Sequence, residues 1–231
     1  MTFKDKTLIV IAPHPDDEVL GCGGLISRVK ADGGKVYVMI ITLGNQPQYG
    51  STSKADIRIG ETEETMEFLK VDDYEICWVD DKKHLKLDSI PQKDLIDLIE
   101  NSSKVSLNKI KPDIVAIPHP SSNQDHRAVF DASYTACRPR PHEDKPFQHM
   151  VLIYEDASQA WSKNVFRPNF YINLKEFLDS KCKALSFYKS QLHSHPHYIS
   201  VEAVRNLAGV RGIEAGLKHA EAFRIERLLI E

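Results

Sequence analysis

Short, almost purely hydrophobic runs alternate along the chain with longer segments in which apolar residues recur at helical spacing. Such runs are typical of strands buried on both faces of a parallel sheet, and the longer segments are typical of amphipathic helices. We predict strands over residues 8–12, 36–42, 76–79, 112–118, 151–155 and 167–172, the last at a sheet edge because Pro168 lies at its start. We predict helices over residues 20–30, 57–69, 91–100, 129–137, 174–191, 201–217 and 220–229. This alternation predicts an α/β fold, with a Rossmann-like, mostly parallel sheet flanked by helices.

A cluster of polar residues directly follows the first predicted strand, where His14 precedes the consecutive acids Asp16, Asp17 and Glu18 by two residues. Open α/β sheets bind ligands at the carboxyl ends of their strands. His14 and Asp17 can hold a divalent metal ion, and the neighbouring carboxylate of Asp16 is then left to act as a base. The structural alternative is that Asp16 or Asp17 caps the next helix, but a cap explains only one of the acids. We therefore predict a metal site at the carboxyl ends of the strands.

A second polar loop follows the strand predicted over residues 112–118, and it offers two candidates for a third metal ligand. In a parallel sheet this loop lies at the same edge as the first one. His126 stands near the start of a helix, and the preceding Asp125 could orient its imidazole. His119 is the competitor, because it lies closer to the strand. We favour His126.

Three glycines, Gly21, Gly23 and Gly24, follow the acids and suggest a dinucleotide-binding fingerprint. The match fails, because the sixth position of that pattern is Ile26 and the acids occupy the place of the pyrophosphate. We expect these glycines to allow close packing of the first helix against the sheet.

Composition narrows the class of protein. A chain of 231 residues with 42% hydrophobic and 27% charged residues is typical of a globular protein, and we expect a single domain over residues 1–231. The net charge of −3 gives no reason to expect a nucleic-acid partner. No long apolar segment and no signal-peptide core are present, so we expect no membrane span and a cytoplasmic location. The four cysteines are widely spaced without a CxxC motif, which favours reduced thiols.

The two metal motifs, residues 13–18 (PHPDDE) and 125–129 (DHRAV), closely resemble those of the LmbE/PIG-L deacetylases. These are zinc-dependent enzymes that remove the acetyl group from conjugates of N-acetylglucosamine. The resemblance extends over nearly the whole chain, through Arg58 and Glu61, the segment from Lys183 to Gln191, Arg211-Gly212 and residues 220–223.

The resemblance implies a role for several residues. His14, Asp17 and His126 would bind Zn²⁺, although another divalent transition metal fits the same ligands. Asp16 would be the general base. Substrate contacts are implied for Arg58 and for one of Asp80 and Asp81.

Asn123 departs from the family pattern. Many members have a histidine at this position, three residues before the second metal histidine, where it is thought to stabilise the oxyanion. Asparagine can donate a hydrogen bond but carries neither a proton to transfer nor a charge. Either Asn123 does this work or a nearby histidine replaces it, the candidates being His119, His193, His195 and His197.

The expected function is therefore hydrolysis of the acetamide of a small amino-sugar conjugate by metal-activated water. Two alternatives stay open: a hydrolase of another N-acyl amine, and a zinc- or sugar-binding module without activity. The sequence leaves the aglycone and homo-oligomer formation open. Specificity is expected from the loop at residues 43–53 and from the histidine-rich segment at residues 193–197.

Overall fold

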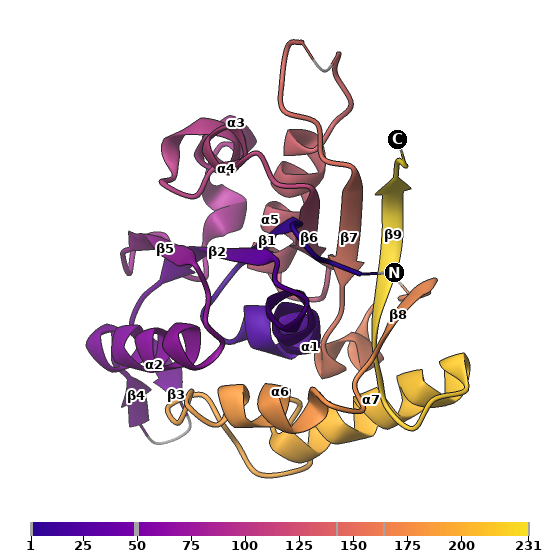
Figure 1. Cartoon of the computed structure of the whole chain (residues 1–231). Helices are drawn as coiled ribbons and strands as arrows, with labels where there is room; N and C mark the ends of the chain where they lie inside the picture. Colours follow the sequence, from indigo (N-terminus) through magenta and orange to yellow (C-terminus); the bar gives the residue numbers. More distant parts are fainter. Residues whose placement is uncertain (1, 49–50, 142, 164, 231) are drawn as a thin grey trace.

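The computed structural model describes residues 2–48, 51–141, 143–163 and 165–230, and its centre is a seven-stranded sheet (Figure 1). The strand order is β5-β2-β1-β6-β7-β9-β8. The first five of these strands pair in parallel, whereas β9 is antiparallel to both β7 and the edge strand β8. The bounds are β1 Thr7–Ala12, β2 Lys35–Leu43, β5 Asp73–Val79, β6 Ile114–Pro118, β7 Met150–Tyr154, β8 Phe170–Asn173 and β9 Ala220–Leu228. The predicted Rossmann-like α/β fold is confirmed.

Helices cover both faces of the sheet, as the hydrophobic runs require (Figure 1). In β1, Leu8 and Val10 pack into one core, and Ile9 and Ile11 into the other. All four side chains are fully buried, which explains why the strand is apolar at successive positions. One face carries α1 (Asp17–Ala31), α2 (Ala55–Phe68), α6 (Leu178–Leu185) and α7 (Val201–Ala215); the other carries α3 (Gln92–Asp97), α4 (Leu107–Ile110) and α5 (Gln124–Ala136).

One predicted helix is wrong, because residues 220–229 contain strand β9. β9 lies between β7 and β8, and its first four residues are buried. Alanine and glutamate there favour a helix locally, but pairing on both sides of the strand outweighs that preference.

Other predicted elements differ in their bounds. The long helix predicted over 174–191 is confined to α6, and turns follow it. Helices α1 and α5 begin three and five residues earlier than predicted, and α3 continues as a π-helical turn, η2 (Leu98–Ser102). The predicted loop at 43–53 contains a short hairpin of β3 (Gln46–Gln48) and β4 (Ser51–Ser53), and residues 49–50 lie outside the described chain.

The glycines of α1 pack closely, as expected. A Cβ at Gly21 would lie 2.1 Å from Cδ2 of Tyr154 on β7, and a Cβ at Gly24 would lie 2.2 Å from Cδ2 of Leu174. The first helix therefore approaches the sheet at a distance that larger side chains would prevent.

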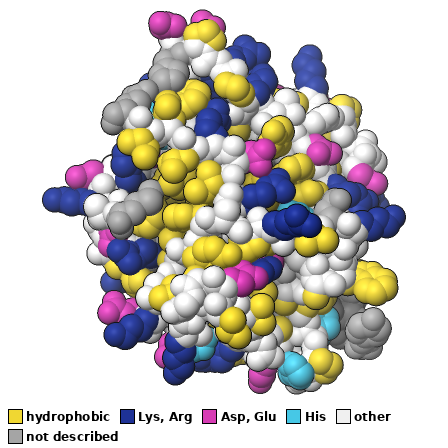
Figure 2. Space-filling view, turned by 90° about the vertical axis from the view of Figure 1, so that its right-hand side faces the viewer, with side chains coloured by type: hydrophobic (Ala, Val, Ile, Leu, Met, Phe, Trp, Pro, Cys, Tyr) yellow, Lys and Arg dark blue, Asp and Glu magenta, His cyan; other side chains and the backbone are white. Residues whose placement is uncertain are grey.

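The β8–β9 edge of the sheet faces the viewer in Figure 2, where hydrophobic side chains gather among lysines and arginines. Leu228 of β9 and the following Ile230 are exposed. β8 has only four residues, and a short edge strand limits pairing with another sheet. None of the helices in the described part of the chain is long and apolar enough to cross a membrane.

The arrangement of the strands brings the two predicted metal loops together. β1 lies between β2 and β6, so the chain leaves β1 toward one side of the sheet and later returns to build the other side from β6. The loops after β1 and β6 therefore flank the point where the strand order reverses, which is the usual ligand site of open α/β sheets.

Candidate metal centre

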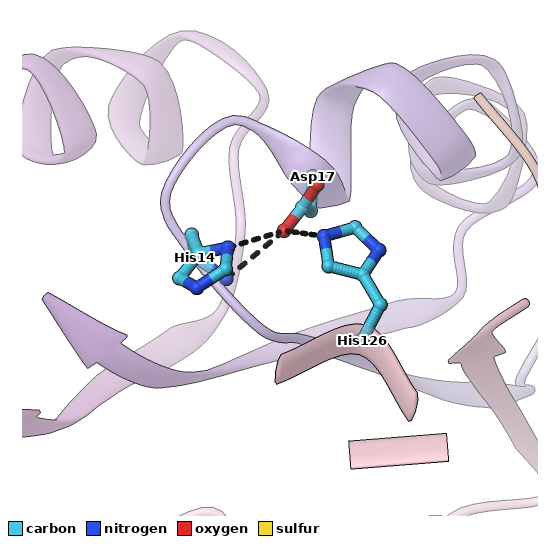
Figure 3. A group of neighbouring side chains, drawn as sticks. All are labelled: His14, Asp17 and His126. Atoms are coloured by element: carbon cyan, nitrogen blue, oxygen red, sulfur yellow. Dashed lines mark hydrogen bonds and ion pairs between the residues drawn. The ribbon is translucent and has the colours of Figure 1, made fainter. Parts of the chain in front are cut away.

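Three of the predicted ligands lie together at this point. His14 follows β1, Asp17 opens α1, and His126 lies in the first turn of α5. Oδ2 of Asp17 is 3.4 Å from Nδ1 of His14 and 3.3 Å from Nε2 of His126, and it also accepts the backbone N–H of His14 (Figure 3). All three residues are buried, and their ligand atoms lie within 4.8 Å of one another.

Asp125 orients the imidazole of His14. Its Oδ2 lies 2.8 Å from Nε2 of His14, and its Oδ1 accepts the backbone N–H of Leu87. A carboxylate is only an acceptor, so Nε2 of His14 carries the proton and Nδ1 presents its lone pair toward Asp17. Two imidazole nitrogens and a carboxylate oxygen suit zinc, and the residues therefore fit such an ion. The sequence interpretation was wrong on one point: Asp125 hydrogen-bonds His14 rather than orienting its neighbour His126.

The charges of the cluster are coupled. Burial favours the neutral form of Asp17, but the interactions with His126 and His14 outweigh it and lower the pKa of Asp17. Burial also disfavours the charged form of His126, but Asp17 outweighs it and raises the pKa of His126 to about 9. The two residues therefore form an ion pair at neutral pH, and a metal ion bound here would have to displace the proton of His126.

The carboxylate of Asp16 is available for chemistry. Asp16 holds the N-cap position of α1, but its side chain makes no capping hydrogen bond, so capping does not explain this acid. Its φ of 100° is unusual for a residue with a side chain. Burial and the charge of Asp17 raise the pKa of Asp16 well above its usual range, while Arg58 opposes this.

Glu18 and Tyr188 support this turn, and sequence reasoning gave neither a role. The fully buried carboxylate of Glu18 accepts the backbone N–H of Asp16 and, at 2.6 Å, the hydroxyl of Tyr188. In the sequence, the two residues were marked only by lying within segments that resemble the family.

A cavity of about 670 Å³ opens over the cluster. It is lined by six of the predicted site residues, namely His14, Asp16, Asp17, Arg58, Asn123 and His126. The structure thus places the predicted base and the predicted ligands around one space large enough for a sugar conjugate.

Comparisons with known proteins identify the family. The profile of the family described as PIG-L, GlcNAc-PI de-N-acetylase, matches residues 9–137, more than half of the chain. The chain belongs to the PIG-L deacetylase family. It is 31% identical over 197 residues to the uncharacterized deacetylase YaiS of Escherichia coli K12, covering 81% of this chain and 92% of that protein.

One further sequence relative and one structural neighbour are also similar to this chain. A probable N-acetyl-α-D-glucosaminyl L-malate deacetylase 2 of Bacillus cereus is 25% identical, over 81% of this chain and 84% of its own. The structure of GalB, the 4-carboxy-2-hydroxymuconate hydratase of Pseudomonas putida KT2440, superposes with a TM-score of 0.76 over 98% of both chains. At 17% identity this likeness concerns the fold alone.

In this PIG-L protein Arg58 is held at the cavity by two partners. Its Nη1 donates to the carbonyl of Gly44 and lies 3.1 Å from Nε2 of His84. Burial, followed by the charges of His14 and Arg58, lowers the pKa of His84 to about 3, so this imidazole is neutral and accepts the hydrogen bond. His84 was missed by sequence reasoning, and no motif marked it.

The predicted substrate contacts Asp80 and Asp81 lie in the turn after β5 and do not line the cavity. Asp81 accepts hydrogen bonds from the backbone and side-chain amides of Asn45, and Asp80 accepts one from the backbone of Lys82. Both carboxylates thus have local structural partners.

The candidates for stabilising the oxyanion differ in whether they line the cavity. Asn123 caps α5, because its Oδ1 accepts the backbone N–H of Asp125, so its amide nitrogen is the atom that can donate. His197 lines the cavity, and its Nδ1 accepts the backbone N–H of Ile199, which leaves the proton on Nε2. The other three candidates do not line this cavity, namely His119, His193 and His195.

Proposed function

We propose that this protein hydrolyses the acetamide group of an N-acetylglucosamine-type conjugate, releasing acetate and a free amine. One observation carries the proposal: the carboxylate of Asp16, which caps nothing, lies beside a His/Asp/His cluster in a large cavity. Family membership supports amide hydrolysis as the reaction, and the description of the matching family supports an N-acetylglucosamine substrate.

The metal ligands would be Nδ1 of His14, a carboxylate oxygen of Asp17 and Nε2 of His126, with Zn²⁺ as the proposed ion. When bound, zinc supplies Lewis acidity and lowers the pKa of a coordinated water molecule to about 7.

Asp16 takes a proton from the attacking water and returns it to the leaving amine. A buried carboxylate with a raised pKa is a stronger base than one in water, and this favours the first transfer. The same raised pKa lets Asp16 hold the proton until the C–N bond breaks. Atoms balance, because water supplies the hydroxyl of acetic acid and the hydrogen of the amine.

Donors for the developing oxyanion are the amide nitrogen of Asn123 and Nε2 of His197. We propose Asn123 as the functional equivalent of the family's histidine, since it caps α5, the helix that carries His126. Among the described residues that line the cavity, Arg58 supplies a cation for substrate hydroxyl or phosphate groups, whereas Asp80 and Asp81 remain predictions without support from the cavity. The cytoplasmic location also stays a prediction.

The test is acetate release from a panel of N-acetylglucosamine conjugates by the zinc-loaded protein. Asp16→Asn should retain stoichiometric zinc and lose turnover by about 10²- to 10⁴-fold, the usual worth of a general base. Asp17→Asn is the matched variant, and it should lose zinc as well. Full turnover by Asp16→Asn would refute its role. Tight zinc binding without acetate release from any conjugate would favour another N-acyl amine or a binding module.

A further inference from the structure

Trp161 is the most exposed large hydrophobic side chain of the described residues, with 86% of its surface in contact with solvent. It ends the short helix η3 (Ala157–Trp161), which follows β7 after Glu155 and Asp156. Trp161 lines the cavity over the metal cluster, and it also lines a second cavity of about 680 Å³. The indole therefore stands at the boundary between the two spaces.

The two cavities share more than this indole. Ser121 and Ser122, in the loop between β6 and α5, and Ala160 of η3 line both. The same β6–α5 loop leads to Asn123 and, in α5, to His126. The second cavity therefore adjoins the site where the amide would be cleaved.

The chemistry of the second cavity differs from that of the first. Asp16, Asp17 and Asp156 line the first cavity, but no carboxylate is among the described residues that line the second. Arg127 and Lys163 line the second, together with serine residues. The electrostatic potential there favours an anion.

Arg127 is anchored rather than free to move. Its Nη1 donates to the carbonyl of Ser121 at 3.1 Å and to that of Ser122 at 2.7 Å. These bonds hold the guanidinium at the wall that both cavities share, while its other nitrogens remain geometrically suited to a carboxylate or phosphate.

We propose that the second cavity is a subsite for the part of the substrate beyond the amino sugar, and that it takes an anionic group. Trp161 forms the stacking wall, because an indole offers a flat apolar face to the C–H face of a ring or chain. Arg127 and Lys163 bind the negative charge. The proposal rests on the proposed deacetylase function and names its substrate class: an amino-sugar conjugate with a carboxylate or phosphate in its aglycone.

The kinetic test compares an anionic conjugate, N-acetylglucosaminyl malate, with a neutral one, N,N′-diacetylchitobiose. Lys163→Glu should lower the ratio of kcat/KM for the anionic over the neutral conjugate at least tenfold, through KM rather than kcat. Lys93→Glu, an equal change of charge at an exposed position of α3 outside both cavities, should leave the ratio as in the wild type. An unchanged ratio in Lys163→Glu would overturn the proposal.

Binding gives an independent readout, because the chain has only two tryptophans, Trp78 and Trp161. Titration of the wild type with N-acetylglucosaminyl malate should change tryptophan fluorescence, and Trp161→Phe should lose that change. Trp161→Ala should weaken the affinity for the conjugate more than Trp161→Phe, which keeps an aromatic wall. If fluorescence changes but no conjugate of the panel releases acetate, the proposed deacetylase function fails, and what remains is binding of an anionic conjugate beside Trp161. If acetate is released but Trp161→Phe titrates like the wild type, the subsite is wrong and the function stands.

Discussion

Asp125→Asn is the substitution that separates metal binding from folding most cleanly in this site. Oδ1 of Asp125 accepts the N–H of Leu87 at 2.9 Å, and Oδ2 lies 2.8 Å from Nε2 of His14. Asparagine can keep its oxygen toward Leu87, but it then presents an amide NH₂ to His14. Two donors cannot face each other, so the proton of His14 must move from Nε2 to Nδ1.

That tautomer removes the ligand lone pair, because Nδ1 is the atom that faces Asp17. Mutation of such an outer partner typically costs 10- to 100-fold in metal affinity, which corresponds to about 1.4–2.8 kcal/mol. We expect a loss in this range for zinc, measured by competition with a chromophoric chelator at pH 7. Thermal unfolding of the metal-free protein should change little, because the hydrogen bond to Leu87 is kept.

Asp131→Asn is the matched control, since Asp131 is an exposed residue of the same helix α5. It should bind zinc like the wild type. If Asp125→Asn also retained wild-type zinc affinity, the assignment of Nδ1 of His14 as the ligand atom would be refuted. If Asp125→Asn lost affinity only together with its fold, the orienting role would be refuted instead.

Two further substitutions test the packing of α1 and the turn before it. Gly21→Ala places a Cβ 2.1 Å from the ring of Tyr154 and should destabilise the protein by about 1–3 kcal/mol in denaturant titrations. Gly60→Ala in α2 is the control, because no atom lies within 4 Å of its Cβ, and it should not destabilise the protein. Equal effects of the two substitutions would refute the packing argument. Burial raises the pKa of Glu18 to about 7, so its contribution to stability is complete below the unfolded value of about 4.5 and is lost as the pH rises through 7. Relative to Glu18→Gln, the metal-free wild type should therefore lose stability between pH 5 and pH 8, and parallel pH profiles would contradict this.

The grouping of the three candidate metal ligands could be predicted because residue type and strand order together determine it. His14 and Asp17 follow one buried strand and His126 follows another, and parallel strands bring both ends to one edge. The residues that act on them could not be predicted in the same way. His84 reaches Arg58 from the turn after β5, and no local pattern marks such a contact.

The wrong predictions have a related cause, because each was made from local sequence alone. Residues 220–229 favour a helix by composition, yet the sheet offers partners on both sides, and β9 forms. Asp125 was assigned to its neighbour in sequence, although successive residues of a helix point about 100° apart. Local preference decides an element only where no partner distant in sequence competes for it.

The strained turn at residues 14–18 is held in place by hydrogen bonds from neighbouring residues. Asp16 has a φ of 100°, a conformation that costs about 1–3 kcal/mol for a residue with a side chain. The turn is fixed from two directions, since the N–H of His14 donates to Asp17 and the N–H of Asp16 donates to Glu18, whose carboxylate also accepts Tyr188. These bonds hold the carboxylate of Asp16 away from the helix end it would otherwise cap and at the cavity, where a base is useful. The proposed role of Asp16 as a base would account for this strain, whereas a helix-capping role would not require it.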